Sequence, residues 1–233
     1  MQRFIGKEKI GSHIILSEEE TKHIKASRLK VKDSLEVWLN DRLYLCSLEQ
    51  LEHRQALCRI LKEDTKPFPK PKVMLCQCVP IDLKSMDYIV EKVSEAGAYR
   101  LFPIVSSRSF RNVEVVERRL ERWERLSLAS FKQCGRPIPM LVERPIKLED
   151  IEAKEDLNLL LDNFSEGKSM KEIDLKGVES VSLVVGPEGG FAEKESKALV
   201  EKGFISIRLH PFVLRSETAS VVAVGLLMNL YGI

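Results

Sequence analysis

Long apolar runs, a secretory leader and membrane-spanning segments are all missing from this sequence. A helix needs roughly 18 consecutive apolar residues to cross a bilayer, and the apolar run at 219–230 is shorter than that. Residues 1–10 carry charges where a secretory signal needs an apolar segment. These absences predict a soluble, cytoplasmic protein with no membrane partner.

Cysteine and histidine are sparse and have none of the spacings that build metal or disulfide sites. The five cysteines are an odd number without a CxxC pair, and the four histidines lack HxxxH spacing. Cys76 and Cys78 alternate within an apolar run, as small packed hydrophobes do. The pattern excludes a disulfide framework and a structural zinc site, so we expect no metal.

Charge is unevenly distributed, although the net charge of the whole chain is only +2. Residues 1–150 carry 28 Lys and Arg against 22 Asp and Glu, whereas residues 151–233 carry 9 against 13. A basic first part suits a polyanionic partner such as RNA, because phosphate contacts come mainly from Lys and Arg. Scattered, solvated surface charge is the alternative interpretation.

The first seventy residues have the pattern of a small β-barrel. Two apolar runs, 35–39 and 43–48, flank a polar turn at 40–42 and predict a hairpin. Ser17 precedes three glutamates, which is typical of a capped helix start. The segment 66–72 has three prolines in five positions and predicts a stiff connector. We therefore place one domain at 1–70 and a second at 73–233.

The second domain alternates strands with helices, which predicts an α/β fold with a parallel sheet. Helices are expected at 84–96, where Gly97 ends the run, and at 112–134, where Gly135 follows. An apolar helix is expected at 219–230. Five apolar runs have the composition of buried parallel strands: 73–79, 101–105, 157–161, 181–185 and 204–209.

Two polar loops follow the last two predicted strands. Gly186-Pro187-Glu188-Gly189-Gly190 lets backbone amides approach a ligand, but it has neither the dinucleotide nor the P-loop spacing. A tight strand-to-helix turn is the alternative. Arg215-Ser216-Glu217-Thr218 combines an arginine, an acid and two hydroxyls. Helix capping explains one hydroxyl and the acid, but it does not require the arginine.

These two loops, read together, resemble the RsmE-type methyltransferases of the SPOUT class. The carrying segments are LVVGPEGGF at 183–191 and VLRSETAS at 213–220. His23 to Arg28, Lys84 to Gly97, Leu101 to Arg108 and Gln133 to Arg136 resemble further elements of that family, in family order. The resemblance covers almost the whole chain.

The resemblance implies a function, a fold and a cofactor. The family methylates N3 of a uridine in 16S ribosomal RNA of the small subunit and uses S-adenosylmethionine. The implied fold is a SPOUT trefoil knot at about 157–233, preceded by a PUA-like RNA-binding barrel, in a homodimer. Three loops at strand ends would hold the cofactor, where an α/β sheet is expected to bind ligands. Its expected contacts are Leu161, Gly186, Pro187, Glu188, Gly189, Gly190, Leu209, Leu214, Ser216, Thr218 and Ala219.

Residue type and position suggest the remaining roles. Glu217 is our candidate for the base or orienting carboxylate, and Arg215 for stabilising the uracil anion and holding phosphate. Basic residues of the first domain are candidates for RNA phosphate contacts: Arg3, Lys22, Lys25, Arg28, Lys30 and Lys32.

Two departures from the family pattern keep other functions open. His210 and Phe212 stand where relatives commonly have glycine and arginine, and Ala26-Ser27 replace an apolar pair. The alternatives are a non-catalytic RNA-binding ribosome-assembly factor of the same fold, and a SPOUT methyltransferase acting on another RNA or on a ribose oxygen.

Overall fold

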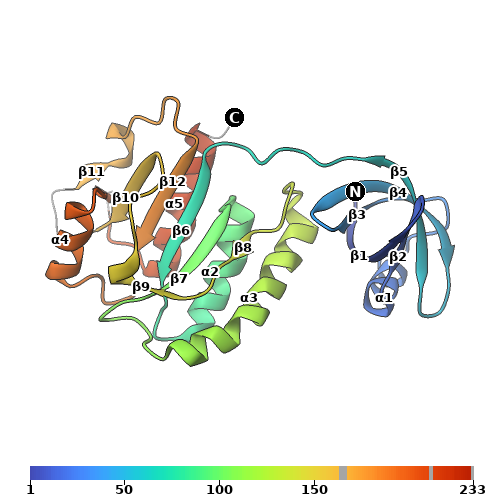
Figure 1. Cartoon of the computed structure of the whole chain (residues 1–233), viewed down its shortest axis with the longest axis horizontal. Coiled ribbons are helices and arrows are strands. Elements are labelled where there is room, and N and C mark those ends of the chain that lie inside the picture. Colours follow the sequence, from blue (N-terminus) through green and yellow to red (C-terminus); the bar gives the residue numbers. More distant parts are fainter. Residues whose placement is uncertain (163–166, 210–211, 232–233) are drawn as a thin grey trace. The chain divides into compact units, whose positions relative to one another are not determined.

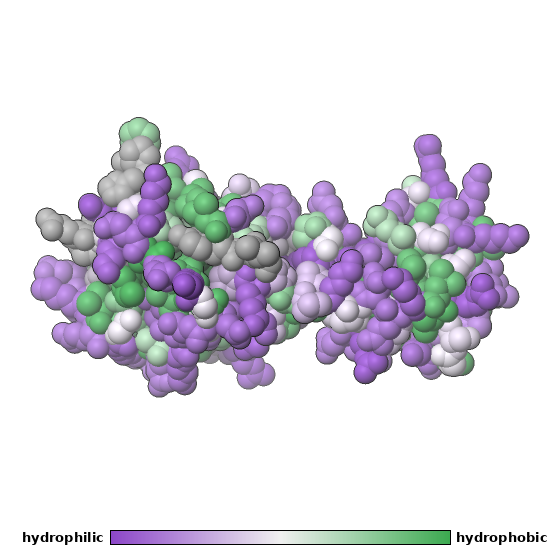
Figure 2. Space-filling view, turned by 90° about the horizontal axis from the view of Figure 1, so that it is seen from above, coloured by the Kyte–Doolittle hydropathy of each residue, from purple (hydrophilic) through white to green (hydrophobic). Residues whose placement is uncertain are grey.

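The computed structural model describes residues 1–162, 167–209 and 212–231 of the chain (Figure 1). The chain divides into two compact units. The smaller contains Met1–Pro67 together with Lys132–Ile138, and the larger contains Phe68–Phe131 and Pro139–Ile233. In the face shown in Figure 2, hydrophilic side chains cover most of both units.

The smaller unit is a closed barrel of five strands, as the sequence predicts. Its strands run in the order β1-β2-β5-β4-β3, and a parallel β1–β3 pair closes it. Apolar side chains on alternate positions fill its interior. The strands and one helix are β1 (Arg3–Ile10), β2 (His13–Leu16), α1 (Glu18–Ala26), β3 (Ser34–Leu39), β4 (Arg42–Leu51) and β5 (Ala56–Glu63).

Local sequence signals in this unit are confirmed. Asn40 and Asp41 both have positive φ, of 49° and 58°, and connect β3 to β4 as the two-residue turn of a hairpin. The Ser17 hydroxyl accepts a hydrogen bond from the Glu20 amide at 3.2 Å and caps α1.

The larger unit is an α/β domain built on a parallel sheet, which confirms the predicted fold class. Its order is β11-β13-β10-β12-β6-β7-β8, with β9 also paired to β7. All five predicted strands are present. The strands are β6 (Lys72–Cys78), β7 (Arg100–Val105), β8 (Leu141–Val142), β9 (Ile146–Lys147), β10 (Leu157–Leu161), β11 (Lys168–Ser169), β12 (Ser180–Val185) and β13 (Ile205–Arg208).

Helices cover both faces of this sheet. Helices α2 (Leu83–Ala96), α3 (Val113–Cys134) and α5 (Ser216–Tyr231) supply one apolar core, and α4 (Glu193–Glu201) with adjoining segments supplies the other. Trp123 is fully buried, and its indole nitrogen donates to the Asp87 carboxylate at 2.9 Å, which joins α3 to α2. Among the described residues, no helix is long and apolar enough to cross a membrane.

The last helix begins earlier than the sequence predicts. α5 starts at Ser216, and its first backbone bond runs from the Ala219 amide to the Arg215 carbonyl at 2.7 Å. Ser216 to Thr218 therefore form a helical turn, although their polar side chains are typical of a loop. The reason is tertiary, because the Ser216 hydroxyl bonds outside its own helix.

Burial of the thiols generates a prediction. Burial raises the pKa of Cys46, Cys58 and Cys76 to about 12 and raises the pKa of Cys78 as well, whereas Cys134 is exposed. Only the thiolate reacts with disulfide reagents. At pH 8, Ellman's reagent should modify one thiol in the folded protein and all five in guanidinium. Cys134→Ser should abolish the native reaction, and rapid native modification of several thiols would contradict this burial pattern.

Candidate functional site

Three loops meet at the carboxyl ends of β10, β12 and β13 and enclose a cleft. The loops follow Leu161, Val185 and Arg208, three positions that parallel pairing places at one edge of the sheet. The interior of the cleft is about 90 Å³. The lining residues are Leu161, Asp162, Val185, Gly186, Pro187, Glu188, Gly190, Phe191, Leu209, Val213, Leu214, Ser216 and Ala219.

Nine of the eleven residues predicted to hold the cofactor line this cleft, and two do not. Gly189 lies in the same turn, but its carbonyl accepts a hydrogen bond from Arg108 at 2.9 Å. Thr218 lies at a neighbouring depression. His210 and Phe212 are the two positions where this loop departs from the family pattern. His210 lies outside the described residues, and the Phe212 side chain is 76% exposed.

The turn at 186–190 is held by hydrogen bonds within the turn and to the segment before α2. Gly190 has a φ of 62°, which favours glycine, and its amide bonds the Pro187 carbonyl at 2.9 Å. The Glu188 carboxylate accepts from the Ile81 amide at 3.2 Å. A Cβ added at Gly186 would lie 3.2 Å from the Phe191 ring, so the ring would have to move by a few tenths of an ångström.

A buried polar network that the sequence reasoning missed lies directly behind this turn. Gln77 of β6 is fully buried, and its amide nitrogen donates to the Ser216 hydroxyl at 3.0 Å and to the Cys78 carbonyl at 2.8 Å. The Ser216 hydroxyl donates to the Gly186 carbonyl at 2.5 Å, and the Ser220 hydroxyl donates to the Gln77 amide oxygen. The network therefore joins the central strand, the glycine turn and α5.

Asp162 is a second wall residue that the sequence reasoning did not select. It follows β10, is 3% exposed, and accepts a hydrogen bond from the Ser196 hydroxyl of α4. Its carboxylate gives this wall a negative charge. The sequence did contain a signal for it, because Asp162 directly follows the predicted strand 157–161. Residues just after the carboxyl end of a parallel strand often bind ligands.

The candidate catalytic residues do not line the cleft. Arg215, Glu217 and Thr218 line a shallow depression together with Asp82, Lys84, Ser85 and Tyr88 of the α2 region. Ser216 and Ala219 of the same helical turn line the cleft instead. Since residues three apart share a face of a helix, the first turn of α5 presents one face to each side.

The basic residues proposed for RNA divide into one buried and several exposed side chains. Arg3 is 5% exposed, pairs with Glu36 at 2.7 Å and donates to the Arg136 carbonyl at 2.6 Å. It therefore braces the barrel and does not lie on the surface where phosphate would meet it. The exposed members are Lys22, Lys25, Arg28, Lys30 and Lys32.

No group of three or more His, Cys, Asp or Glu side chains is arranged to hold a metal ion within the part of the chain that the structure describes.

Comparison with known proteins identifies the family. The RNA methyltransferase domain family matches residues 66–228. A ribosomal RNA small subunit methyltransferase E from Aquifex aeolicus is 39% identical over 229 residues, which cover 98% of this chain and 100% of that protein. The chain belongs to this methyltransferase family. Its member from Mesomycoplasma hyopneumoniae is 29% identical and covers 95% of the chain.

Solved structures agree with this membership. A methyltransferase of Legionella pneumophila in complex with the cofactor SAM aligns with a TM-score of 0.85 at 25% identity, covering 100% of this chain and 98% of that one. A family member from Neisseria gonorrhoeae gives a TM-score of 0.87 at 24% identity, with the same coverages, and supports the fold. The family resemblance read from the two C-terminal motifs is confirmed.

The Gln77 network generates a stability and binding prediction. In Gln77→Met the side chain keeps its approximate length but loses its hydrogen bonds, so we expect the free energy of unfolding to fall by about 1–3 kcal/mol. S-adenosylmethionine should also bind more weakly in calorimetry. The reason is that the Ser216 hydroxyl, which bonds the Gly186 carbonyl, loses its hydrogen bond from Gln77. Leu75→Met, on the same face of the same strand, is the control. Affinity equal to wild type in Gln77→Met would refute the bracing role.

Proposed function

We propose that this protein transfers a methyl group from S-adenosylmethionine to N3 of a uridine in 16S ribosomal RNA of the small subunit. The observation that carries the proposal is the cleft at the ends of β10, β12 and β13, in a chain of this family. The SAM-bound Legionella structure, which aligns over the whole chain, supports the cofactor assignment.

The residues of the cleft fit this cofactor. Leu209, Leu214 and Ala219 offer apolar surface for the faces of an adenine ring, and the bare backbone of the Gly186–Gly190 turn offers groups for its edge. The buried Asp162 carboxylate suits a cationic ligand. When bound, the cofactor supplies an electrophilic methyl group attached to a sulfonium sulfur.

We assign the work on the uracil to the first turn of α5. Uracil N3 carries a proton and becomes a good nucleophile only when that proton leaves. The Glu217 carboxylate takes up the proton or orients the base, and the Arg215 guanidinium stabilises the resulting imide anion. Arg215 and Glu217 belong to the turn whose Ser216 and Ala219 line the cleft, and this proximity to the cofactor site supports the roles. Since the target base is stacked or paired in RNA, it has to be exposed before reaction.

We further propose how the remaining parts of the chain contribute. Residues 1–70 form an RNA-docking domain that uses the exposed Lys22, Lys25, Arg28 and Lys30, and residues 73–233 form the methyltransferase domain, knotted at about 157–233. We place the reaction in the cytoplasm. RNA binding through these lysines should weaken steeply as salt is raised.

The direct test of this function is methyl transfer in vitro. Small subunits from a strain without the N3-methyluridine modification would be incubated with the protein and isotope-labelled S-adenosylmethionine. Nucleoside mass spectrometry should then detect labelled N3-methyluridine. Absence of any labelled nucleoside would favour the assembly-factor alternative, and a different labelled nucleoside would reassign the target.

The catalytic assignment predicts selective loss of turnover. Arg215→Ala should lower kcat about 100-fold to 1000-fold, the usual effect of removing a group that stabilises developing charge. Glu217→Gln should lower it about 100-fold to 10,000-fold. Both should bind S-adenosylmethionine as wild type does, because neither residue lines the cleft. Arg125→Ala and Glu121→Gln, two exposed positions of α3, are the controls. A variant with full kcat would remove that residue from the mechanism.

We also propose that the protein is a homodimer. Tyr88 on α2 and Val222 and Leu230 on α5 are 50%, 37% and 58% exposed, which leaves apolar surface on two adjacent helices. Sedimentation equilibrium should give twice the chain mass of 26.6 kDa. Val222→Glu should shift the equilibrium toward monomer, whereas a monomeric wild type at all concentrations would exclude the dimer.

A further inference from the structure

A second and wider cavity lies in the larger unit, and it shares no lining residue with the cofactor cleft. Its walls come from the end of β7 and the following loop, the start of α3, the short 3-10 helix at Leu148–Asp150, and α4. The interior is about 510 Å³, which is within the usual range for a small-molecule site.

The floor of this cavity is apolar. We call its five apolar lining residues the floor: Val105, Val113, Leu148, Ala198 and Leu199. Val113 and Ala198 are exposed at its margin. Two of these, Leu148 and Leu199, are anchored in the core on the α4 side of the sheet. A flat apolar part of a ligand would therefore be removed from water here, which an isolated phosphate ion does not need.

The rim carries an excess of positive charge. Four cations, Arg111, Lys147, Lys194 and Lys202, line the cavity together with two acids, Glu149 and Glu195.

Both acids are already engaged in this structure. Glu195 accepts from the backbone amides of Ser107 and Ala192, each at 2.8 Å, and Glu149 lies 3.5 Å from Lys147. Lys202 donates to the Ile151 carbonyl at 3.0 Å. Lys194 is exposed and lies near the start of α4, in position to meet an anion.

One hydroxyl group beside this cavity has no hydrogen-bond partner. The Ser107 hydroxyl oxygen is shielded from solvent and has no hydrogen-bond partner among the described residues. The residue lines the cavity. This oxygen has no contact with solvent, so a ligand reaches it only after the Ser107 side chain rotates toward the cavity. A hydrogen bond made in that way would offset the cost of the unpaired hydroxyl.

We propose that this cavity binds one nucleotide of the single-stranded RNA substrate, at a position other than the methylated base. The base lies on the apolar floor, and Ser107 rotates to hydrogen-bond it, while its phosphate meets the rim cations, Lys194 foremost. The proposal rests on the proposed function, since that function brings a single-stranded RNA to this unit. A nucleoside phosphate is the ligand class that combines a flat, largely apolar ring with an anion.

The cavity is linked to the cofactor turn through a few residues. Arg108, next to Ser107, donates to the Gly189 and Phe191 carbonyls at 2.9 and 3.1 Å. Glu195 bonds the backbone on both sides, at Ser107 and Ala192. A nucleotide bound in this cavity would therefore lie near the Gly186–Gly190 turn, where we propose that the methyl donor binds. It would hold the RNA strand near the reaction.

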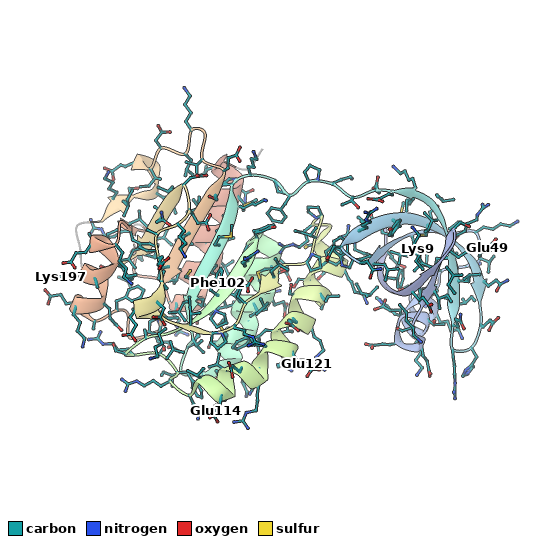
Figure 3. The ribbon with its side chains drawn as sticks, viewed as in Figure 1. Lys9, Glu49, Phe102, Glu114, Glu121 and Lys197 are labelled. Carbon is teal, nitrogen blue, oxygen red and sulfur yellow. The ribbon has the colours of Figure 1, made fainter. Side chains whose placement is uncertain are left out.

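Charge reversal at the rim tests the proposal. Binding of a fluorescent single-stranded RNA from the target region would be measured by anisotropy for Lys194→Glu and for the control Lys197→Glu. Lys197 lies on the same helix but points away from the sheet (Figure 3) and outside the cavity. Lys194→Glu should weaken binding about tenfold and lower the salt slope by about 1. Lys197→Glu should change affinity less than about twofold.

Filling the floor tests the apolar half of the site. Ala198→Trp should occupy the cavity and weaken RNA binding without a change of charge, whereas Val200→Trp, exposed on α4 and outside the cavity, should not. Equal effects of the cavity variants and their controls, or no effect of either cavity variant, would overturn the proposal. Tight binding of uridine monophosphate that does not compete with RNA would also overturn it, by assigning the cavity to a free nucleotide.

These readouts separate the cavity from the proposed function. S-adenosylmethionine binding should be unchanged in all four variants, which also reports that they fold. A wild type that binds RNA at the cavity but transfers no methyl group would refute the proposed function alone. Active variants with wild-type KM for RNA and wild-type affinity would refute the cavity alone.

Discussion

The buried amide of Gln77 is the constraint on which the candidate site depends. A fully buried amide is costly unless its donors and acceptor are bonded. Gln77 meets this requirement through Ser216, Ser220 and the Cys78 carbonyl, and Ser216 in turn bonds the Gly186 carbonyl. These bonds hold the glycine turn and the first turn of α5 against β6. Both turns line the cleft.

The same turn of α5 places the residues proposed for cofactor binding and those proposed for catalysis next to one another, on different surfaces. Ser216 and Ala219 face the cleft, whereas Arg215 and Glu217 line the depression beside α2. The 186–191 segment is held from the other side by Arg108. The first turn of α5 thus lies between the cleft and the depression. The 186–191 segment, through Arg108, lies between the cleft and the cavity next to α4.

The sequence predicted what local patterns encode. Strands of a parallel sheet are buried on both faces, so continuous apolar runs located its five longer strands. The two-residue strands β8, β9 and β11 are too short to leave such a run and were not predicted. Gln77 was missed because a single polar residue does not interrupt such a run. The start of α5 was missed because Ser216 to Thr218 are typical of a loop, and their helical turn depends on contacts with β6 and β12. The sequence reasoning took Arg3 for a surface residue. It could not foresee the burial of Arg3, because its ion-pair partner Glu36 is distant in sequence.

A crystal structure of the protein with S-adenosylhomocysteine bound would test the central claim most directly. We predict density for the ligand between the loops that follow β10, β12 and β13. Its adenine should lie against Leu209 and Leu214, with the Gly186–Gly190 backbone at its edge, and the Gln77 network should be unchanged. Density in another cavity, or a cleft that stays empty at saturating ligand, would contradict the account.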